Sequence, residues 1–263
     1  MLESERLQLF KNITLRDVDE IHHPGIVSDL HLTIQNKIDS LANSSSEKGT
    51  LLIDFFNHLK KEISSEMYEE IQLEFLSNKK PDKYGNMIKY LDSTLWFKGK
   101  MTIIMKTNLH NREPMKILDI GAGCGHFAFL AKFFGHDAHA TNPPRIKLRP
   151  KGEDRHLYHA LCNLYQIESH ELMIHAKQAI TGIAERFDMI TALMVEFNHI
   201  AGTPWGVEEW DFFLDDIKGC LLKPGGIIFL GLTRGKLSAE SWSYLKSRAT
   251  WYDEKGKHIF IKT

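Results

Sequence analysis

The spacing of apolar residues changes near residue 116, and this change limits the folds open to the chain. Earlier residues place apolar side chains every three or four positions, as in LLIDFFNHLKKEI and MYEEIQLEFL, which indicates amphipathic helices. Later residues form short apolar runs separated by helical segments, a pattern typical of a mostly parallel sheet covered by helices. We expect strands at 116–120, 137–141, 171–175, 189–193 and 227–232. The final stretch, ATWYDEKGKHIFIKT, alternates around a Glu-Lys-Gly turn and predicts a hairpin.

The same change divides the chain into two predicted parts. Residues 1–110 form a helical N-terminal extension of four or five helices, the last running from about 84 to 109, and residues 111–263 form the sheet domain. The connecting stretch KTNLHNREP is short and is neither Gly/Ser-rich nor Pro-rich. We therefore expect the helical part to pack on the sheet domain rather than to hang from it as a tethered domain.

Composition excludes several classes of protein. The 33 Lys and Arg nearly balance the 34 Asp and Glu, so no general affinity for nucleic acid or a membrane surface is indicated. Cys124, Cys162 and Cys220 lie far apart, which argues against a disulfide framework or a cysteine-rich zinc site. The start MLESERLQLF is unlike a signal peptide, and no run approaches the ~20 apolar residues of a membrane span. We expect a soluble cytoplasmic protein.

The stretch ILDIGAGCGHFAFLAKFF places three glycines where a strand turns into a helix. Glycines there tolerate positive φ and expose backbone, while a helix N-terminus offers unpaired N–H groups to a polar ligand. Asp119 precedes Gly121 by two positions, and Gly123 and Gly125 follow. A dinucleotide-binding turn requires a further glycine where this chain has His126, which disfavours that type of site.

This turn resembles motif I of class I S-adenosylmethionine-dependent methyltransferases. The resemblance extends through ERFDMITALMVEFNHI, similar to the family's fourth strand and following loop, and LLKPGGIIFLGL, similar to its turn into the fifth strand. The hairpin resembles the family's antiparallel sixth and seventh strands. The resemblance implies a Rossmann-like, doubly wound, mostly parallel seven-stranded α/β sheet, S-adenosylmethionine as the cofactor and methyl transfer as the reaction. No metal is implied, and no histidine pair has a zinc-site setting such as His-Glu-x-x-His.

The resemblance also implies the cofactor-binding positions. They are the glycine turn with Asp119, Gly121, Ala122, Gly123 and Gly125, and Leu193 at the end of the fourth strand. Two positions depart from the family pattern. Asn142 stands where the family usually has an acidic residue for the ribose, and Ala176-Lys177 stand where an Asp often lies near the adenine. Because a neutral amide makes weaker hydrogen bonds than a carboxylate, Asn142 predicts weaker ribose binding rather than none.

Two loops supply candidate acceptor residues. The segment MVEFNHIAGTPWGVEEW contains His199, the best candidate for a general base, with Glu196 and Asn198 nearby and Trp205 as a possible pocket wall. Core packing is the competing interpretation of this tryptophan. Arg145 opens the basic run RIKLRPKGEDR, which is either a solvated loop or a site for an anionic acceptor. The string NPPR before it lies after the second strand and lacks an aromatic fourth residue, so we reject it as a catalytic motif.

The favoured function is methyl transfer to a small molecule, with an anionic acceptor as the narrower prediction and no nucleic-acid or membrane partner. One alternative is a cofactor-binding module of the same fold that has lost turnover, for which Asn142 and Ala176 are the relevant residues. Another is a different nucleotide-dependent enzyme with a Rossmann-like sheet. The sequence gives no indication of the oligomeric state.

Overall fold

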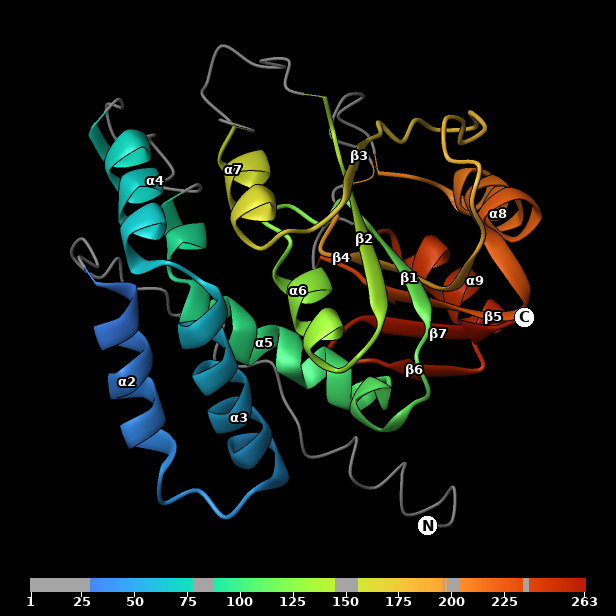
Figure 1. The fold of residues 1–263 in the computed structure, drawn as a ribbon. Helices are drawn as coiled ribbons and strands as arrows, with labels where there is room; N and C mark the ends of the chain where they lie inside the picture. The colour runs from blue at the N-terminus through green and yellow to red at the C-terminus, as the bar shows by residue number, and fades with distance from the viewer. Residues whose placement is uncertain (1–28, 78–87, 145–155, 196, 198–203, 234–236) are drawn as a thin grey trace. The chain divides into compact units, whose positions relative to one another are not determined.

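The structure is a computed structural model that describes residues 29–77, 88–144, 156–195, 197, 204–233 and 237–263. Figure 1 labels the helices and strands of the chain, which divides into two compact units, each made of several segments. Unit 1 consists of Met1–Arg112, Gly123–Gly135 and Arg145–Ile167, and unit 2 of Glu113–Ala122, His136–Pro144 and Glu168–Thr263. None of the helices in the described ranges is long and apolar enough to cross a membrane.

Within its described residues, unit 1 contains helices and no strands. Its helices are α2 (Leu30–Leu41), α3 (Glu47–Glu62), α4 (Ser65–Ser77), α5 (Ser93–Lys106), α6 (His126–Phe133) and α7 (His156–Leu164), with short 3₁₀ turns η2 (Ile88–Leu91) and η3 (Leu109–Asn111). Side chains cap several of these helices. Asp29, Ser46 and Asp92 accept hydrogen bonds from otherwise unpaired N–H groups in the first turns of α2, α3 and α5. The helical character predicted for the N-terminal part is thus confirmed.

Aromatic rings fill the core of unit 1. Phe55 of α3, Phe97 of α5 and Phe129 of α6 meet with ring centroids 4.7 to 5.9 Å apart. Beside them, Ser93 Oγ lies 2.9 Å from the hydroxyl of Tyr68 and 2.7 Å from that of Tyr165. Because α6 contributes to this core, the unit includes chain well beyond residue 110.

Unit 2 contains a seven-stranded sheet with the order β3-β2-β1-β4-β5-β7-β6. Its strands are β1 (Lys116–Ile120), β2 (Asp137–Asn142), β3 (Ser169–Glu171), β4 (Phe187–Leu193), β5 (Leu222–Gly231), β6 (Trp251–Asp253) and β7 (His258–Lys262). The first five strands are parallel, and β7 pairs antiparallel with both β5 and β6. The predicted seven-stranded, mostly parallel sheet with a terminal hairpin is therefore confirmed.

The third strand lies earlier than predicted. It spans Ser169–Glu171 instead of 171–175, because the backbone ladder with β2 runs from Ala140, whose N–H donates to Glu168, to Asn142, whose carbonyl accepts from Leu172. The apolar residues that suggested a later strand follow the last residue that pairs with β2. Ile174 packs on the hydrophobic core from outside the sheet.

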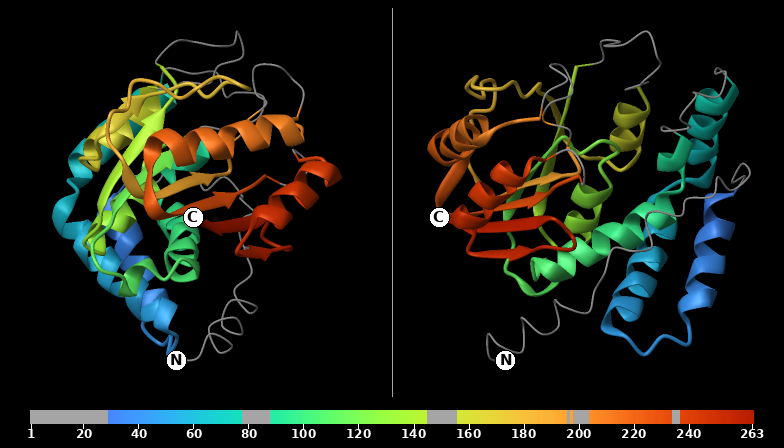
Figure 2. Two further views of the ribbon diagram at one scale, coloured as in Figure 1. Left: turned by 90° about the vertical axis from the view of Figure 1, so that its right-hand side faces the viewer. Right: turned by 180° about the vertical axis from the view of Figure 1, so that it is seen from behind.

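Helices α8 (Val207–Asp216) and α9 (Ala239–Arg248) share one core with the sheet of unit 2 (Figure 2). A π-turn, η4 (Ile217–Leu221), joins α8 to β5. Alternate residues of the strands, including Leu118, Ile190 and Ile228, face the helices and are fully buried. Successive side chains of a strand point to opposite faces, so these alternate residues lie on one face, the face that packs with α8 and α9.

Candidate functional site

The order of the strands in unit 2 marks one place for a ligand. From β1 the chain continues to β2 and β3 on one side, whereas β4 and β5 lie on the other side of β1. In open α/β sheets, ligands bind outside the carboxyl ends of the strands where the strand order reverses in this way. The residues that follow β1, β2 and β4 are therefore the candidates for a binding site.

Gly121 begins the turn after β1 with a φ of +65°, which glycine adopts without steric cost. Its N–H donates to Thr141 Oγ1 at 3.1 Å, and the N–H of Ala122 donates to the Thr141 carbonyl at 3.0 Å. A Cβ on Gly121 would stand 2.7 Å from Cγ2 of Val195, which follows β4. The turn and the segment after β4 thus approach so closely that only glycine fits between them.

Asp119 lies in β1, opposite Thr191 of β4, and is 1% exposed. The Thr191 hydroxyl donates to Asp119 Oδ1 at 2.6 Å. A buried carboxylate requires hydrogen bonds of this kind, because removing its charge from water is costly. The bond keeps the acidic group directly before the glycine turn and joins the two strands between which the strand order reverses.

The next two glycines of the turn belong to unit 1 and also have positive φ, +58° at Gly123 and +76° at Gly125. A Cβ on Gly125 would crowd Cys162 Sγ at 3.0 Å, whereas one on Gly123 would make an ordinary contact of 3.7 Å with Tyr158. Packing within the unit therefore requires glycine at 125. At 123 the requirement comes from the backbone conformation alone.

His126 stands where a dinucleotide-binding turn would have its third glycine, and it begins α6. Burial lowers the pKa of this histidine to about 3, with a smaller contribution from the positive charge of Lys100. The imidazole stacks near Trp96 with a centroid separation of 6.2 Å and meets the Phe97 ring edge-on at 5.0 Å. His126 is thus a neutral side chain within the aromatic core of unit 1.

Asn142 is the last residue of β2, so it lies at the strand end where the family resemblance places the ribose position. Its side chain is buried, and Nδ2 lies 3.5 Å from the hydroxyl oxygen of Ser169 in β3, a weak hydrogen bond. A neutral amide is buried here at lower desolvation cost than a carboxylate. This explains in physical terms why the sheet tolerates asparagine at the position, and leaves its role toward a ribose as a prediction.

The end of β4 has an unusual backbone conformation. Leu193 closes the strand and is 8% exposed. Met194 follows with a φ of +61°, and its N–H donates to the Gly231 carbonyl at 2.6 Å. A left-handed conformation is uncommon for methionine and is found preferentially at functional sites. It occurs here one residue before Val195, the residue that touches the glycine turn.

Ala176 and Lys177 do not end the third strand, contrary to the sequence expectation. The strand stops at Glu171, so the two residues lie in an irregular segment well beyond the sheet edge. The ammonium group of Lys177 pairs with Glu208 and Glu209 of α8, and these hydrogen bonds raise its pKa. The assignment depended on the misplaced strand, and their role in cofactor binding stays a prediction without that support.

Trp205 is buried and packs against Trp210, with ring centroids 5.2 Å apart. The two rings line a cavity of about 20 Å³ together with Val195, Phe197, Leu232, Thr233 and Leu237. That volume holds a water molecule and no methyl acceptor. The packing interpretation of Trp205 therefore accounts for its surroundings, while its predicted contact with the acceptor stays a prediction.

Glu196, Asn198, His199 and Arg145 lie outside the described residues. Their proposed catalytic and substrate-binding roles stay predictions from the sequence.

Sequence reasoning missed three residues of this edge: Thr141, Met194 and Val195. The residue type could have indicated Thr141, since a hydroxyl at the end of a strand is suited to accept a hydrogen bond from a neighbouring turn. Nothing in the sequence indicated Met194 and Val195, because Met194 matters through its backbone conformation and Val195 through its close approach to Gly121.

Comparisons with known proteins give partial structural likenesses only. No protein-family model matches the chain. No curated protein matches it. A structure of Streptomyces venezuelae DesVI matches with a TM-score of 0.33 and 20% identity, covering 46% of this chain and 44% of that one. A methyltransferase from Bacteroides fragilis, in complex with S-adenosyl-L-homocysteine, gives a TM-score of 0.32 and 23% identity, covering 47% and 44%.

A TehB-like methyltransferase from Corynebacterium glutamicum gives a TM-score of 0.40 and 18% identity, covering 60% of this chain and 85% of that one. This chain spans less than half of the length of the first two of these proteins. Likeness at TM-scores below 0.5 supports no functional conclusion, so the description of the fold rests on the strand order of unit 2.

Proposed function

We propose that this chain is an S-adenosylmethionine-dependent methyltransferase, with the cofactor at the turn after β1. The observation that carries the proposal is the close approach of Gly121 to Val195, where a Cβ would stand 2.7 Å from a methyl carbon. It occurs where the strand order reverses, the place where ligands of such sheets bind. Three glycines with positive φ follow one another at alternate positions in this turn. A backbone free of Cβ atoms suits the close approach of a polar ligand.

The residues of the turn and the strand ends fit the parts of this cofactor. N–H groups at the start of a helix favour a carboxylate, and buried Asp119 offers a negative charge to an ammonium group, so the amino-acid end belongs here. Asn142 at the end of β2 would accept hydrogen bonds from the ribose hydroxyls through its neutral amide. Leu193 would supply an apolar contact at the end of β4.

The cofactor supplies a methyl group on a positively charged sulfur. The protein's task is to hold an acceptor lone pair in line with that bond and to receive any proton that the acceptor loses. His199 is the candidate for that proton, six residues beyond the end of β4 in the sequence. For the acceptor itself, the basic run beginning at Arg145 favours a small molecule with a phosphate or carboxylate.

Calorimetry with S-adenosylmethionine, S-adenosylhomocysteine and NAD tests the cofactor. We expect the first two to bind and NAD not to bind. Gly123→Ala should abolish binding, because a side chain at positive φ strains the turn proposed to hold the cofactor, whereas Gly135→Ala, outside that turn, should not. Gly135 is a matched control, since it also has a positive φ, +86°, and a Cβ there would meet nothing within 4 Å. Equal binding by the two variants would place the cofactor elsewhere.

A module that binds the cofactor without turnover is the second candidate, and the neutral, buried Asn142 at the ribose position favours it. Transfer of a labelled methyl group into small-molecule, protein and nucleic-acid fractions separates the two. Binding without transfer into any fraction supports the module. Replacing Arg145 and Arg149 together with alanine should lower acceptor affinity and leave cofactor binding unchanged, and unchanged turnover would contradict an anionic acceptor.

A further inference from the structure

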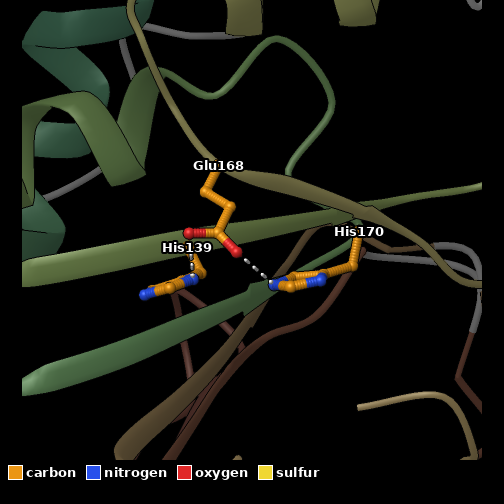
Figure 3. A group of neighbouring side chains, drawn as sticks. All are labelled: His139, Glu168 and His170. Carbon is orange, nitrogen blue, oxygen red and sulfur yellow. Dashed lines mark ion pairs between the residues drawn. The ribbon is translucent and has the colours of Figure 1, made fainter.

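Two histidines and a glutamate meet at the β3 edge of the sheet in unit 2 (Figure 3). His139 belongs to β2, His170 to β3, and Glu168 directly precedes β3. One donor atom from each side chain lies within 4.8 Å of the other two. Glu168 stands between the histidines, with Oε2 3.5 Å from His139 Nδ1 and Oε1 3.6 Å from His170 Nε2. The imidazole planes are nearly parallel, at 10°.

The pairing of the strands brings these side chains together. In the parallel ladder His170 pairs with Thr141, which is two residues beyond His139 in β2. Side chains two positions apart on a strand share a face, so His139 and His170 project from the same face of neighbouring strands. Glu168 is two residues before His170 and joins them. Sequence spacing does not reveal this group, because 28 positions separate His139 from Glu168.

A hydrogen bond fixes the tautomer of His139. Its Nε2 lies 3.0 Å from Asp137 Oδ1, and since a carboxylate only accepts, Nε2 carries the hydrogen. In the neutral ring Nδ1 then presents a lone pair. This atom is buried without a hydrogen-bond partner, as is His170 Nε2. The His139 lone pair faces the Glu168 carboxylate, an arrangement that is repulsive unless a positive charge lies between them, and His170 Nε2 lies 3.6 Å from the other oxygen of the same carboxylate.

We propose that His139 Nδ1, His170 Nε2 and the Glu168 carboxylate bind one zinc ion. Two imidazoles and a carboxylate are donors that zinc accepts, and tetrahedral bonds of roughly 2.0–2.1 Å place ligand atoms about 3.4 Å apart. The three donor atoms lie within 4.8 Å of one another, so small side-chain shifts would bring them to this spacing around one ion. The bond from His139 to Asp137 completes the arrangement, because histidines that bind metals usually donate their other N–H to a carboxylate.

The ion would join β3 to the rest of the sheet. β3 has three residues and pairs only with β2 among the described strands, so two ligands on or next to it and one on β2 would cross-link the edge. The side chain of Glu168 is 65% exposed, which leaves the fourth position of the ion open to water. Three protein ligands and a water are the coordination of catalytic rather than structural zinc sites, so a bound ion would hold a water as well as cross-link this edge.

A calorimetric titration of EDTA-treated protein with ZnCl₂ tests the proposal. We expect one high-affinity equivalent per chain for the wild type. Glu168→Gln and His170→Ala should each lower the affinity for zinc by roughly tenfold or more. Asp137→Asn leaves all three ligands in place and should lower the affinity by about 10- to 100-fold. His175→Ala is the matched control, since it removes an exposed histidine of the same unit outside the group, and should bind as the wild type does.

Glu168→Gln is the decisive variant, because its exposed side chain can change without disturbing the core. Hydrogen exchange adds a structural reading: ZnCl₂ should slow exchange of the Ala140 and Leu172 amides, which form the β2–β3 ladder, in the wild type and not in Glu168→Gln. The proposal is wrong if the wild type takes up no zinc, or if Glu168→Gln takes it up equally.

Discussion

Gly121 and Gly123 have almost the same φ, yet a side chain would meet different surroundings at the two positions. At Gly121 an added Cβ overlaps Val195, whereas at Gly123 it makes only an ordinary contact. We therefore predict that Gly121→Ala lowers the free energy of unfolding by about 2–4 kcal/mol, through backbone strain and overpacking together. Gly123→Ala should cost about 1–2 kcal/mol from strain alone. Urea unfolding measures both, and equal costs would contradict the close approach.

Asn142 allows the ribose assignment to be tested from the opposite direction. Asn142→Asp places a carboxylate at the end of β2 and should tighten cofactor binding by about 1 kcal/mol through charge-assisted hydrogen bonds. The same change should destabilise the free protein, because Asn142 is only 1% exposed and a buried charge is costly. Calorimetry and thermal unfolding read the two effects separately. Unchanged or weaker cofactor affinity would count against the assignment.

His126 predicts a pH dependence of stability. Its pKa in the folded protein is about 3, below the ordinary value of 6.5, so the unfolded chain binds more protons between these values. Stability is fully present above pH 6.5 and is lost as the pH falls, by about 2 kcal/mol between pH 7 and pH 5. His126→Phe keeps a buried ring that does not titrate, so its unfolding free energy should vary less over this range. The prediction is wrong if the unfolding free energies of wild type and variant change equally with pH. His175→Ala is the control and should follow the wild type.

Among the elements, the turn after β1 depends on Thr141 of β2, whose hydroxyl accepts the Gly121 N–H at 3.1 Å. Thr141→Val removes this acceptor with little change of shape and leaves a part-buried N–H group unpaired. We expect a loss of about 1–2 kcal/mol in unfolding free energy and weaker cofactor binding. Thr141→Ser retains the hydroxyl and should restore both. If valine is tolerated without loss in either measurement, the backbone bond at Ala122 alone holds the turn.

The accuracy of the sequence predictions differs among elements for physical reasons. β1 and β2 were located within one residue, because each is followed by a strong turn signal, Gly121 or Pro143. β3 was placed two residues too late, because the apolar residues near Ile174 pack outside the sheet. An apolar run alone does not distinguish an edge strand from a segment that covers the core.

The binding edge was predictable only where it depends on residue type. Glycines at alternate positions and an acidic residue before them have distinctive chemistry, and the structure gives all three glycines a positive φ. The contact of Val195 with the turn and the left-handed conformation of Met194 arise from how β4 ends beside β1. The group formed by His139, Glu168 and His170 depends on strand register in the same way. Such features depend on tertiary pairing, which single-sequence patterns do not contain.

On the scale of the whole molecule, each unit is assembled from separate segments of the chain. In unit 1, α6 packs against α5 and α3 through Phe129, whose ring lies 5.9 Å from those of Phe55 and Phe97. A fragment of residues 1–110 lacks α6 and exposes these rings. We therefore predict that it does not fold alone, as judged by circular dichroism and binding of a hydrophobic dye. A fragment with native helix content and a cooperative transition would show instead that the helical part is independent.

Both outer positions of the seven-stranded sheet are occupied by its two shortest strands, β3 and β6, with three residues each. The longest strand, β5, lies between β4 and β7 and has no open side in the ladder. A foreign strand that added to either side of this sheet would gain only a few backbone hydrogen bonds, too few to offset the ordering of a second chain. Unit 2 therefore resists edge-to-edge polymerisation by its strand lengths alone, even when the folded protein is concentrated.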